Sequence, residues 1–68
     1  MKIETLWELP LGRKFSFSGD PSIVLSKGDI VYLWIERNNK GLGDEIIYGT
    51  AKIIKVESKN SYKGERIK

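Results

Sequence analysis

The side chains in this chain that could take part in chemistry are mainly aromatic and basic. Many of them lie in one segment, residues 27–56, which reads KGDIVYLWIERNNKGLGDEIIYGTAKIIKV. Aromatic rings on a sheet surface can stack on nucleic-acid bases, which is worth roughly 1–3 kcal/mol per base, and nearby lysine or arginine side chains can contact phosphates. These residue types therefore predict a binding surface rather than a reaction centre.

The sequence offers little for catalysis. It contains no Cys and no His, which excludes a thiolate, a nucleophile–histidine pair, disulfides and the commonest zinc ligands. Asp44 and Glu45 are adjacent, and neighbouring side chains on a strand point apart. The Gly41-Leu42-Gly43 stretch lacks the Gly-Lys-Ser/Thr that completes a phosphate-binding loop, and no acidic residues have the spacing of a calcium loop. We therefore expect a protein that is not an enzyme and uses no metal or other cofactor.

Length and charge set further limits. A chain of 68 residues forms one small domain with a thin core. The net charge is +3, but residues 52–68 carry +4 and residues 1–51 carry −1. This asymmetry favours an anionic partner, nucleic acid first, with a solvated lysine-rich tail as the alternative explanation.

The composition also bears on location and source. Acidic residues stand where the apolar part of a signal peptide would lie, and no run of about 18 apolar residues could span a membrane. We expect a cytoplasmic protein that does not contact membranes. Abundant Ile, Lys and Glu is typical of hyperthermophile proteins.

Alternating apolar residues predict an all-β fold. In residues 29–37 both faces are largely apolar, as in a strand covered on both sides. In a second strand, over residues 46–57, the apolar positions change from odd to even numbers. That change predicts a β-bulge near Ile53–Ile54, with Gly49 as a second point of bending.

The rest of the chain predicts shorter elements. We expect four to six short, mostly antiparallel strands closed into a small barrel or pseudo-barrel, with little helix, as a single domain over residues 1–68. The further elements are a strand over residues 3–9, a strand over 14–18, a short strand or apolar plug at 23–25, a turn at 27–29, a flexible hairpin loop at 38–45 and a last strand that begins near residue 65.

A family resemblance makes the expectation more specific. The pattern of residues 27–34, a polar loop with glycines and the pattern of residues 47–54 together resemble the centre of an EVE domain, a member of the PUA-like superfamily. The resemblance covers about residues 23–57. It implies a β-barrel that binds nucleic acid and recognises a modified base in an aromatic cage, as in the target-reading domains of McrB-type restriction proteins or in RNA-modification systems. Full EVE domains are about twice this length, so the resemblance implies either a minimal version or part of a longer protein with further domains or subunits.

The resemblance and the composition together define the candidate nucleic-acid-binding residues. Trp34 corresponds to the strand tryptophan of the family, and it could equally be a core residue of the barrel. Trp7 is likewise expected either in the core, together with Phe17, or at the site. The aromatic candidates are Trp34, Tyr48, Tyr32, Phe15 and Trp7, and the basic candidates are Lys14, Arg37, Lys40, Lys52 and Lys55.

Two functions remain open at this point. The first is a nucleic-acid-binding module for DNA or RNA. The second is an SH3-like protein-interaction module or an oligomerisation domain, because exposed aromatic patches serve protein interfaces as readily as bases.

Overall fold

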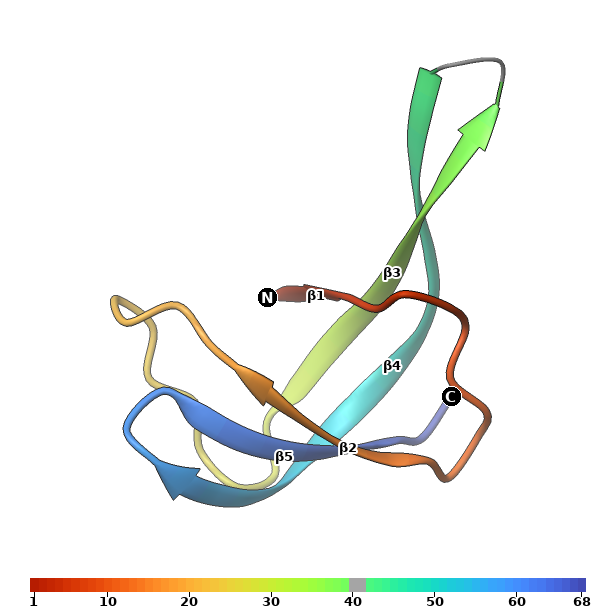
Figure 1. The fold of residues 1–68 in the computed structure, drawn as a ribbon. Coiled ribbons are helices and arrows are strands. Elements are labelled where there is room, and N and C mark those ends of the chain that lie inside the picture. Colours follow the sequence, from red (N-terminus) through yellow and green to blue (C-terminus); the bar gives the residue numbers. More distant parts are fainter. Residues whose placement is uncertain (40–41) are drawn as a thin grey trace.

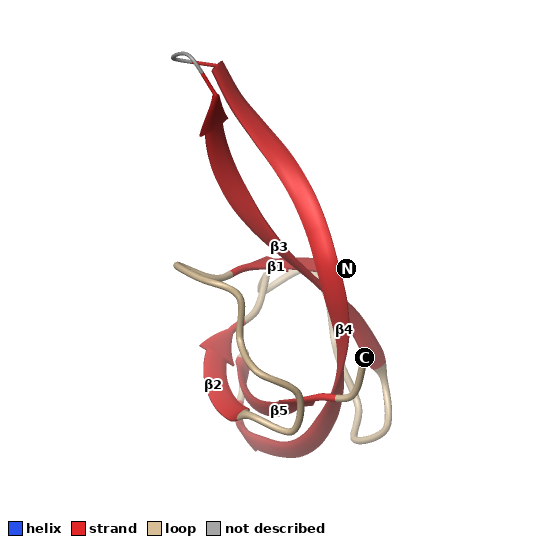
Figure 2. Cartoon of the chain, turned by 90° about the vertical axis from the view of Figure 1, so that its right-hand side faces the viewer, coloured by secondary structure: helices blue, strands red, loops and turns tan. Residues whose placement is uncertain are grey.

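The protein folds as one curled β-sheet of five strands, seen in a computed structural model that describes residues 1–39 and 42–68 (Figure 1). The sheet forms a half-barrel (Figure 2), and the described residues contain no helix, so none that could cross a membrane. The all-β prediction with four to six strands is thus confirmed. The strands are β1 (Lys2–Glu4), β2 (Lys14–Ser18), β3 (Ile30–Asn39), β4 (Leu42–Ser58) and β5 (Ser61–Arg66), in the order β1-β3-β4-β5-β2.

The topology places the first two strands at opposite edges of the sheet. β1 pairs in parallel with β3, and the other three pairings are antiparallel, as expected for most of them. The segment that joins β1 to β2, residues 5–13, must therefore run from one edge of the curled sheet to the other (Figure 1). We call residues 5–13 the strap.

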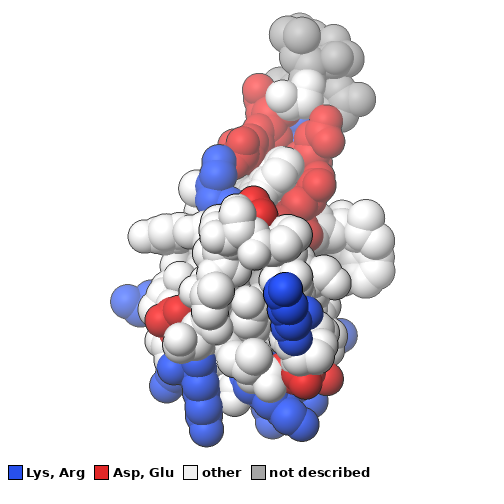
Figure 3. Space-filling view, turned by 90° about the vertical axis from the view of Figure 1, so that its left-hand side faces the viewer, with Lys and Arg blue, Asp and Glu red and all other residues white. Residues whose placement is uncertain are grey.

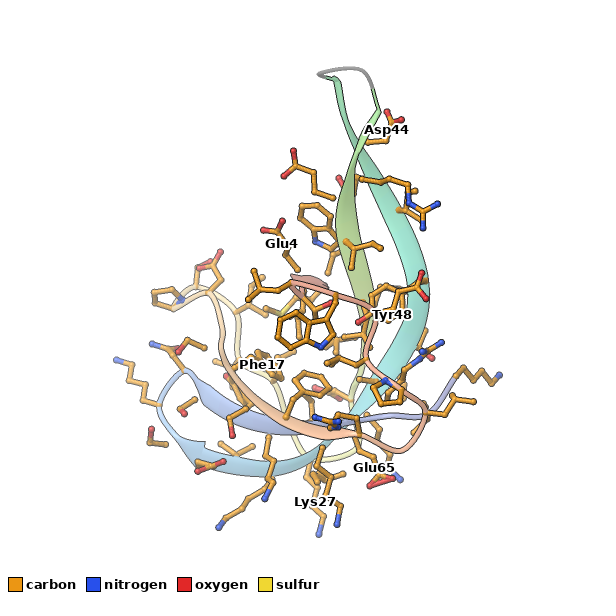
Figure 4. The ribbon with its side chains drawn as sticks, turned by 45° about the vertical axis from the view of Figure 1, so that its right-hand side comes forward. Glu4, Phe17, Lys27, Asp44, Tyr48 and Glu65 are labelled. Atoms are coloured by element: carbon orange, nitrogen blue, oxygen red, sulfur yellow. The ribbon has the colours of Figure 1, made fainter. Side chains whose placement is uncertain are left out.

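The core lies inside the curve of the sheet. Alternate residues of the three central strands point there, because successive side chains of a strand face opposite sides. Phe17 of β2 packs against this core, with its ring 5.5 Å from that of Tyr62, and lies inside the curve in Figure 4. The buried hydrophobic residues of the described chain are Val31, Leu33, Ala51, Ile53 and Tyr62, and burial of each large side chain contributes about 1.5–3 kcal/mol.

The long strand β4 has bulges at the two places that the sequence predicts and a third at Glu57, since Val56 pairs with Tyr62 and Ser58 with Ser61. Against β3, Leu33 lies opposite Gly49 and Trp34 opposite Ile47, so Tyr48 is an extra residue in the ladder. Against β5, Ile53 pairs with Gly64 and Lys55 with Lys63, so Ile54 is extra. A β-bulge of this kind bends and twists the strand that carries it. Because of these bends, β4 can pair with β3 along its first part and with β5 along its last part, and so connects the two sides of the half-barrel.

Several boundaries differ from the sequence prediction. The first strand ends at Glu4 because the Thr5 hydroxyl donates a hydrogen bond to the Trp7 carbonyl (2.8 Å) and turns the chain into the strap. Trp7 is consequently 64% exposed rather than part of the core. The last strand begins at Ser61, earlier than expected, because Tyr62 and Gly64 alternate inward between polar neighbours.

The loop predictions also need correction. The two strands of the central hairpin continue into the expected loop, with residue 38 opposite residue 43 and residue 39 opposite residue 42. Polar sequence permits this extension, since ladder hydrogen bonds use only the backbone. Residues 23–25 form no strand. Leu25 instead packs against the core as the predicted plug, and the turn at Lys27–Asp29 is confirmed, with Gly28 at a φ of +98°.

Two tyrosine hydroxyls form hydrogen bonds that attach the strap and the segment before β3 to the sheet. The Tyr48 hydroxyl lies 2.7 Å from the Thr5 hydroxyl and accepts a hydrogen bond from the Leu9 amide (3.2 Å). Since the Thr5 proton is already donated to the Trp7 carbonyl, Tyr48 is the donor to Thr5. The Tyr62 hydroxyl accepts a hydrogen bond from the Leu25 amide (3.3 Å).

Arg66 completes the attachment of the strap. Its guanidinium donates hydrogen bonds to the carbonyls of Leu9, Tyr48 (3.2 Å) and Lys68 (2.8 Å), and it lies 5.0 Å from the centre of the Tyr48 ring. That distance is within the range of a cation–π interaction. A side chain at Gly49 would collide with the Lys68 carbonyl and come within 2.7 Å of Arg66 Nε, so this position requires glycine.

We expect Tyr48→Phe to lower the free energy of unfolding by about 1–2 kcal/mol, because it removes two hydrogen bonds and leaves the Leu9 amide without a partner. The midpoint of urea denaturation measures this change. Tyr32→Phe is the matched control, since its exposed hydroxyl makes no hydrogen bond to the described residues. Equal midpoints for the two variants would contradict the proposed role of Tyr48.

Candidate functional site

An apolar strip lies on the convex, outer face of β3. Ile30, Tyr32 and Trp34 alternate there with the buried residues of the same strand. Ile30 is 48% and Tyr32 49% exposed, and Trp34 is half-buried. The structure thus places Tyr32 and Trp34, two of the predicted site residues, together on a face that the core does not use.

Four lysines share the same convex face on the neighbouring strands, and we call them the basic patch: Lys14 of β2, Lys52 and Lys55 of β4, and Lys63 of β5. The register places Lys52 opposite Ile30 on one side and Glu65 on the other, and Glu65 is in turn opposite Lys14. The basic patch therefore begins directly beside the apolar strip and continues across three adjacent strands.

The bulge at Ile54 is what turns Lys55 outward. Ile53 points into the core, and in a regular strand Lys55 would point to the same side. The extra residue reverses the alternation, so that Lys55 lies directly opposite Lys63 on the outer face, while Val56 lies opposite the buried Tyr62. The bulge that bends this strand therefore also moves a lysine side chain to the outer face.

The pairing of Lys55 with Lys63 is unfavourable by itself, since like charges directly opposite each other destabilise a sheet. Over residues 1–39 and 42–68, the one ion pair joins Lys2 and Glu45, far from these lysines. The nearby carboxylate of Glu57 accepts a long hydrogen bond (3.5 Å) from Ser16. No described residue forms an ion pair with Lys55 or Lys63, so the positive charge of these two lysines is available to an anion from outside.

The far end of the hairpin carries the opposite charge. We call residues 35–39 of β3 and 42–47 of β4 the arm, because β1 and β5 pair with other parts of these strands. Glu36 lies opposite Glu45 and Arg37 opposite Asp44. Figure 3 shows acidic side chains along this projection and basic ones over the body below it. An anionic ligand would be attracted to the body and repelled by the arm.

The ion pair of Lys2 and Glu45 connects the arm to β1. Lys2 lies opposite Tyr32 and Glu45 opposite Glu36, so the pair spans the part of β3 that carries Trp34. Trp34 is half-buried, whereas Tyr32 is 49% exposed. Tyr32 is therefore the more accessible of the two rings.

The other candidate residues lie elsewhere. Phe15 packs beside the core, its ring 5.8 Å from Phe17, and Tyr48 holds the strap, as described above. Trp7 is exposed on the strap, and Arg37 belongs to the arm. Lys40 lies outside the described residues. The five candidates that the structure brings to one face are Tyr32, Trp34, Lys14, Lys52 and Lys55.

The geometry of the convex face is open. The described part of the chain encloses no pocket and contains no group of acidic side chains that could hold a metal ion. Tyr32 and Phe15 point to opposite sides of the sheet, so these rings do not form a cage together. A planar ligand would lie on this surface rather than inside it.

Comparison of the chain with protein families, with curated proteins and with solved structures finds no match. The class that the structure itself defines is a five-stranded half-barrel with a basic, partly apolar convex face.

The sequence prediction omitted Lys63. It lies before the point near residue 65 where the sequence predicts the last strand to begin, but Tyr62 and Gly64 point inward and therefore direct Lys63 outward. Strict alternation around Tyr62 is the signal that could have identified it.

We expect Lys63→Gln to raise the free energy of unfolding by a few tenths of a kcal/mol at low salt, because it relieves the repulsion with Lys55. Glu65→Gln is the matched change of opposite sign on the same strand. It should lower stability, since Glu65 lies between Lys14 and Lys52. Urea denaturation at two salt concentrations measures both effects, which should shrink as salt screens the charges. A loss of stability in Lys63→Gln would contradict the repulsion.

Proposed function

We propose that the protein is a non-catalytic nucleic-acid-binding module that holds phosphates on the basic patch. The observation that carries this proposal is the pair of lysines at positions 55 and 63, which lie directly opposite each other without an ion-pair partner among the described residues. A phosphate bound near both would offset their repulsion, and phosphate contacts supply most of the affinity of non-specific nucleic-acid binding.

The position of the patch supports the proposal. Lys52 is the neighbour of Ile30 across the ladder and a diagonal neighbour of Tyr32, about 7–8 Å away in a regular sheet. Phosphate-binding side chains and a ring that can stack on a base are thus within one nucleotide's reach of each other. The acidic arm limits the binding surface at the far end of the hairpin, because its carboxylates would repel the phosphates of a nucleic acid.

The salt dependence of binding tests the proposal. We expect the protein to bind a fluorescein-labelled 12-nucleotide oligonucleotide, with an affinity that falls as salt rises. The double variant Lys55→Gln/Lys63→Gln should weaken binding. It should also reduce the slope of log K against log salt by about 1.4 on a single strand, or about 1.8 on a duplex. Fluorescence anisotropy over a salt series measures both quantities.

Arg37→Gln is the control for this experiment. It also removes one positive charge, but from the acidic arm, where Asp44 is the neighbour of Arg37. We expect its slope to equal that of the unmodified protein. Binding that is absent at low salt, or that does not respond to salt, would overturn the proposal.

A second function, binding of a protein partner, is favoured by the strap. Three large apolar side chains are exposed there within six residues: Leu6 (91%), Trp7 (64%) and Leu11 (68%). Contiguous apolar groups of this kind commonly mark protein interfaces. If the strap binds a second copy of the chain, sedimentation velocity should show a dimer that grows with protein concentration and that Trp7→Ser abolishes. A monomer at all concentrations would exclude self-association.

A further inference from the structure

The convex face presents an exposed aromatic ring that no pocket of the described residues encloses. Tyr32 is half-exposed in the middle of the apolar strip, with Ile30 on one side of it along β3 and Trp34 on the other. Its neighbours across the ladder are Lys2 and Thr50, and Tyr32 remains 49% exposed beside them. The ring is thus presented to a flat ligand that approaches the sheet face.

This geometry distinguishes between forms of nucleic acid. In a duplex the faces of the bases are stacked on each other, and an enzyme or reader that needs one base must flip it into a closed pocket at a cost of a few kcal/mol. The described residues form no such pocket. A single strand, in contrast, has bases that can lie on an open sheet surface while a positively charged track holds the backbone.

The lysines define the direction of that track. The order of the strands places the basic patch on β4, β5 and β2, all on the side of β3 away from β1. Neighbouring strands are about 4.8 Å apart, so the path from Tyr32 to Lys14 crosses three spacings, or about 14 Å. Glu65 lies between Lys52 and Lys14, so the pair of Lys55 and Lys63 is the part of this path that lacks a carboxylate directly opposite. The acidic arm, with Glu36 and Glu45, blocks a path along the hairpin instead.

We propose that the convex face binds single-stranded rather than double-stranded nucleic acid, with a base stacked on Tyr32 and the backbone crossing the strands over the basic patch. This inference rests on the proposed function above and specifies its ligand. The positions of Tyr32, Lys52, Lys55 and Lys63 carry it, together with the absence of an enclosing pocket among the described residues.

The test compares a fluorescein-labelled 12-nucleotide single strand, as DNA and as RNA, with the DNA duplex of the same sequence, by anisotropy at low salt. The variants are Tyr32→Leu, which keeps apolar area but removes the ring, and Tyr32→Phe, which keeps the ring. We expect tighter binding of a single strand than of the duplex. Tyr32→Leu should weaken single-strand binding about 5- to 150-fold, whereas Tyr32→Phe should leave it unchanged. Duplex binding should not respond to either variant.

Ile47→Ala is the control for loss of an exposed apolar side chain, since Ile47 lies on the same face but in the arm, and it should not change affinity. Circular dichroism establishes that each variant keeps its fold. Equal or tighter binding of the duplex, or equal affinities for Tyr32→Leu and Tyr32→Phe, would overturn this inference while the salt-dependent binding through the lysines still stands. No binding of any oligonucleotide would overturn the proposed function and this inference with it.

Discussion

The structure depends most on the contacts of Arg66. Through its backbone it pairs with residues 12 and 13, and through its guanidinium it reaches the carbonyls of Leu9, Tyr48 and Lys68. One residue therefore ties β5 to the strap, to β4 and to the following residues. A half-barrel depends on such contacts because its edge strands are not hydrogen-bonded to each other. A core of five buried hydrophobic residues also supplies little stability by itself. Arginine suits the position, since its planar group can serve several carbonyls at once and still pack on a ring.

The second constraint is that β4 pairs with β3 along its first part and with β5 along its last part, so it must bend between the two sides of the half-barrel. Its bulges at Tyr48, Ile54 and Glu57 bend it, and the first two also redirect side chains. At the first, Tyr48 leaves the regular ladder and reaches the strap. At the second, Lys55 moves to the outer face, where it meets Lys63. The closure of the fold and the charge of its surface therefore have a common origin in two extra residues of one strand.

The sequence predicts the parts of this structure that depend on alternation. The strands around Val31 and Phe17 and the bulge at Ile54 follow from it. The prediction that both faces of residues 29–37 are covered is wrong, since Ile30 and Tyr32 are about half-exposed on the side opposite the core. The strap could not be predicted in the same way. Residues 3–9 alternate as a strand does, but the chain must cross from one sheet edge to the other there, and this requirement comes from topology. For the same reason the nine candidate residues that the structure describes divide among two faces, the strap and the arm. Alternation assigns a side of a strand but not the position of that strand in the sheet.

The charge distribution explains how a net charge of only +3 can serve an anionic ligand. The sheet contains two like-charge pairs. Glu36 and Glu45 lie in the arm, where Lys2 compensates one of them, and Lys55 and Lys63 lie on the body, where no described residue forms an ion pair with either. The molecule is 39 Å long, whereas charges are screened over about 8 Å at physiological salt. The acidic arm therefore cannot cancel the field of the basic patch, and the two ends act as separate surfaces. An anion at the patch would therefore meet the field of these lysines and of Glu65 between them, whereas the arm would repel it.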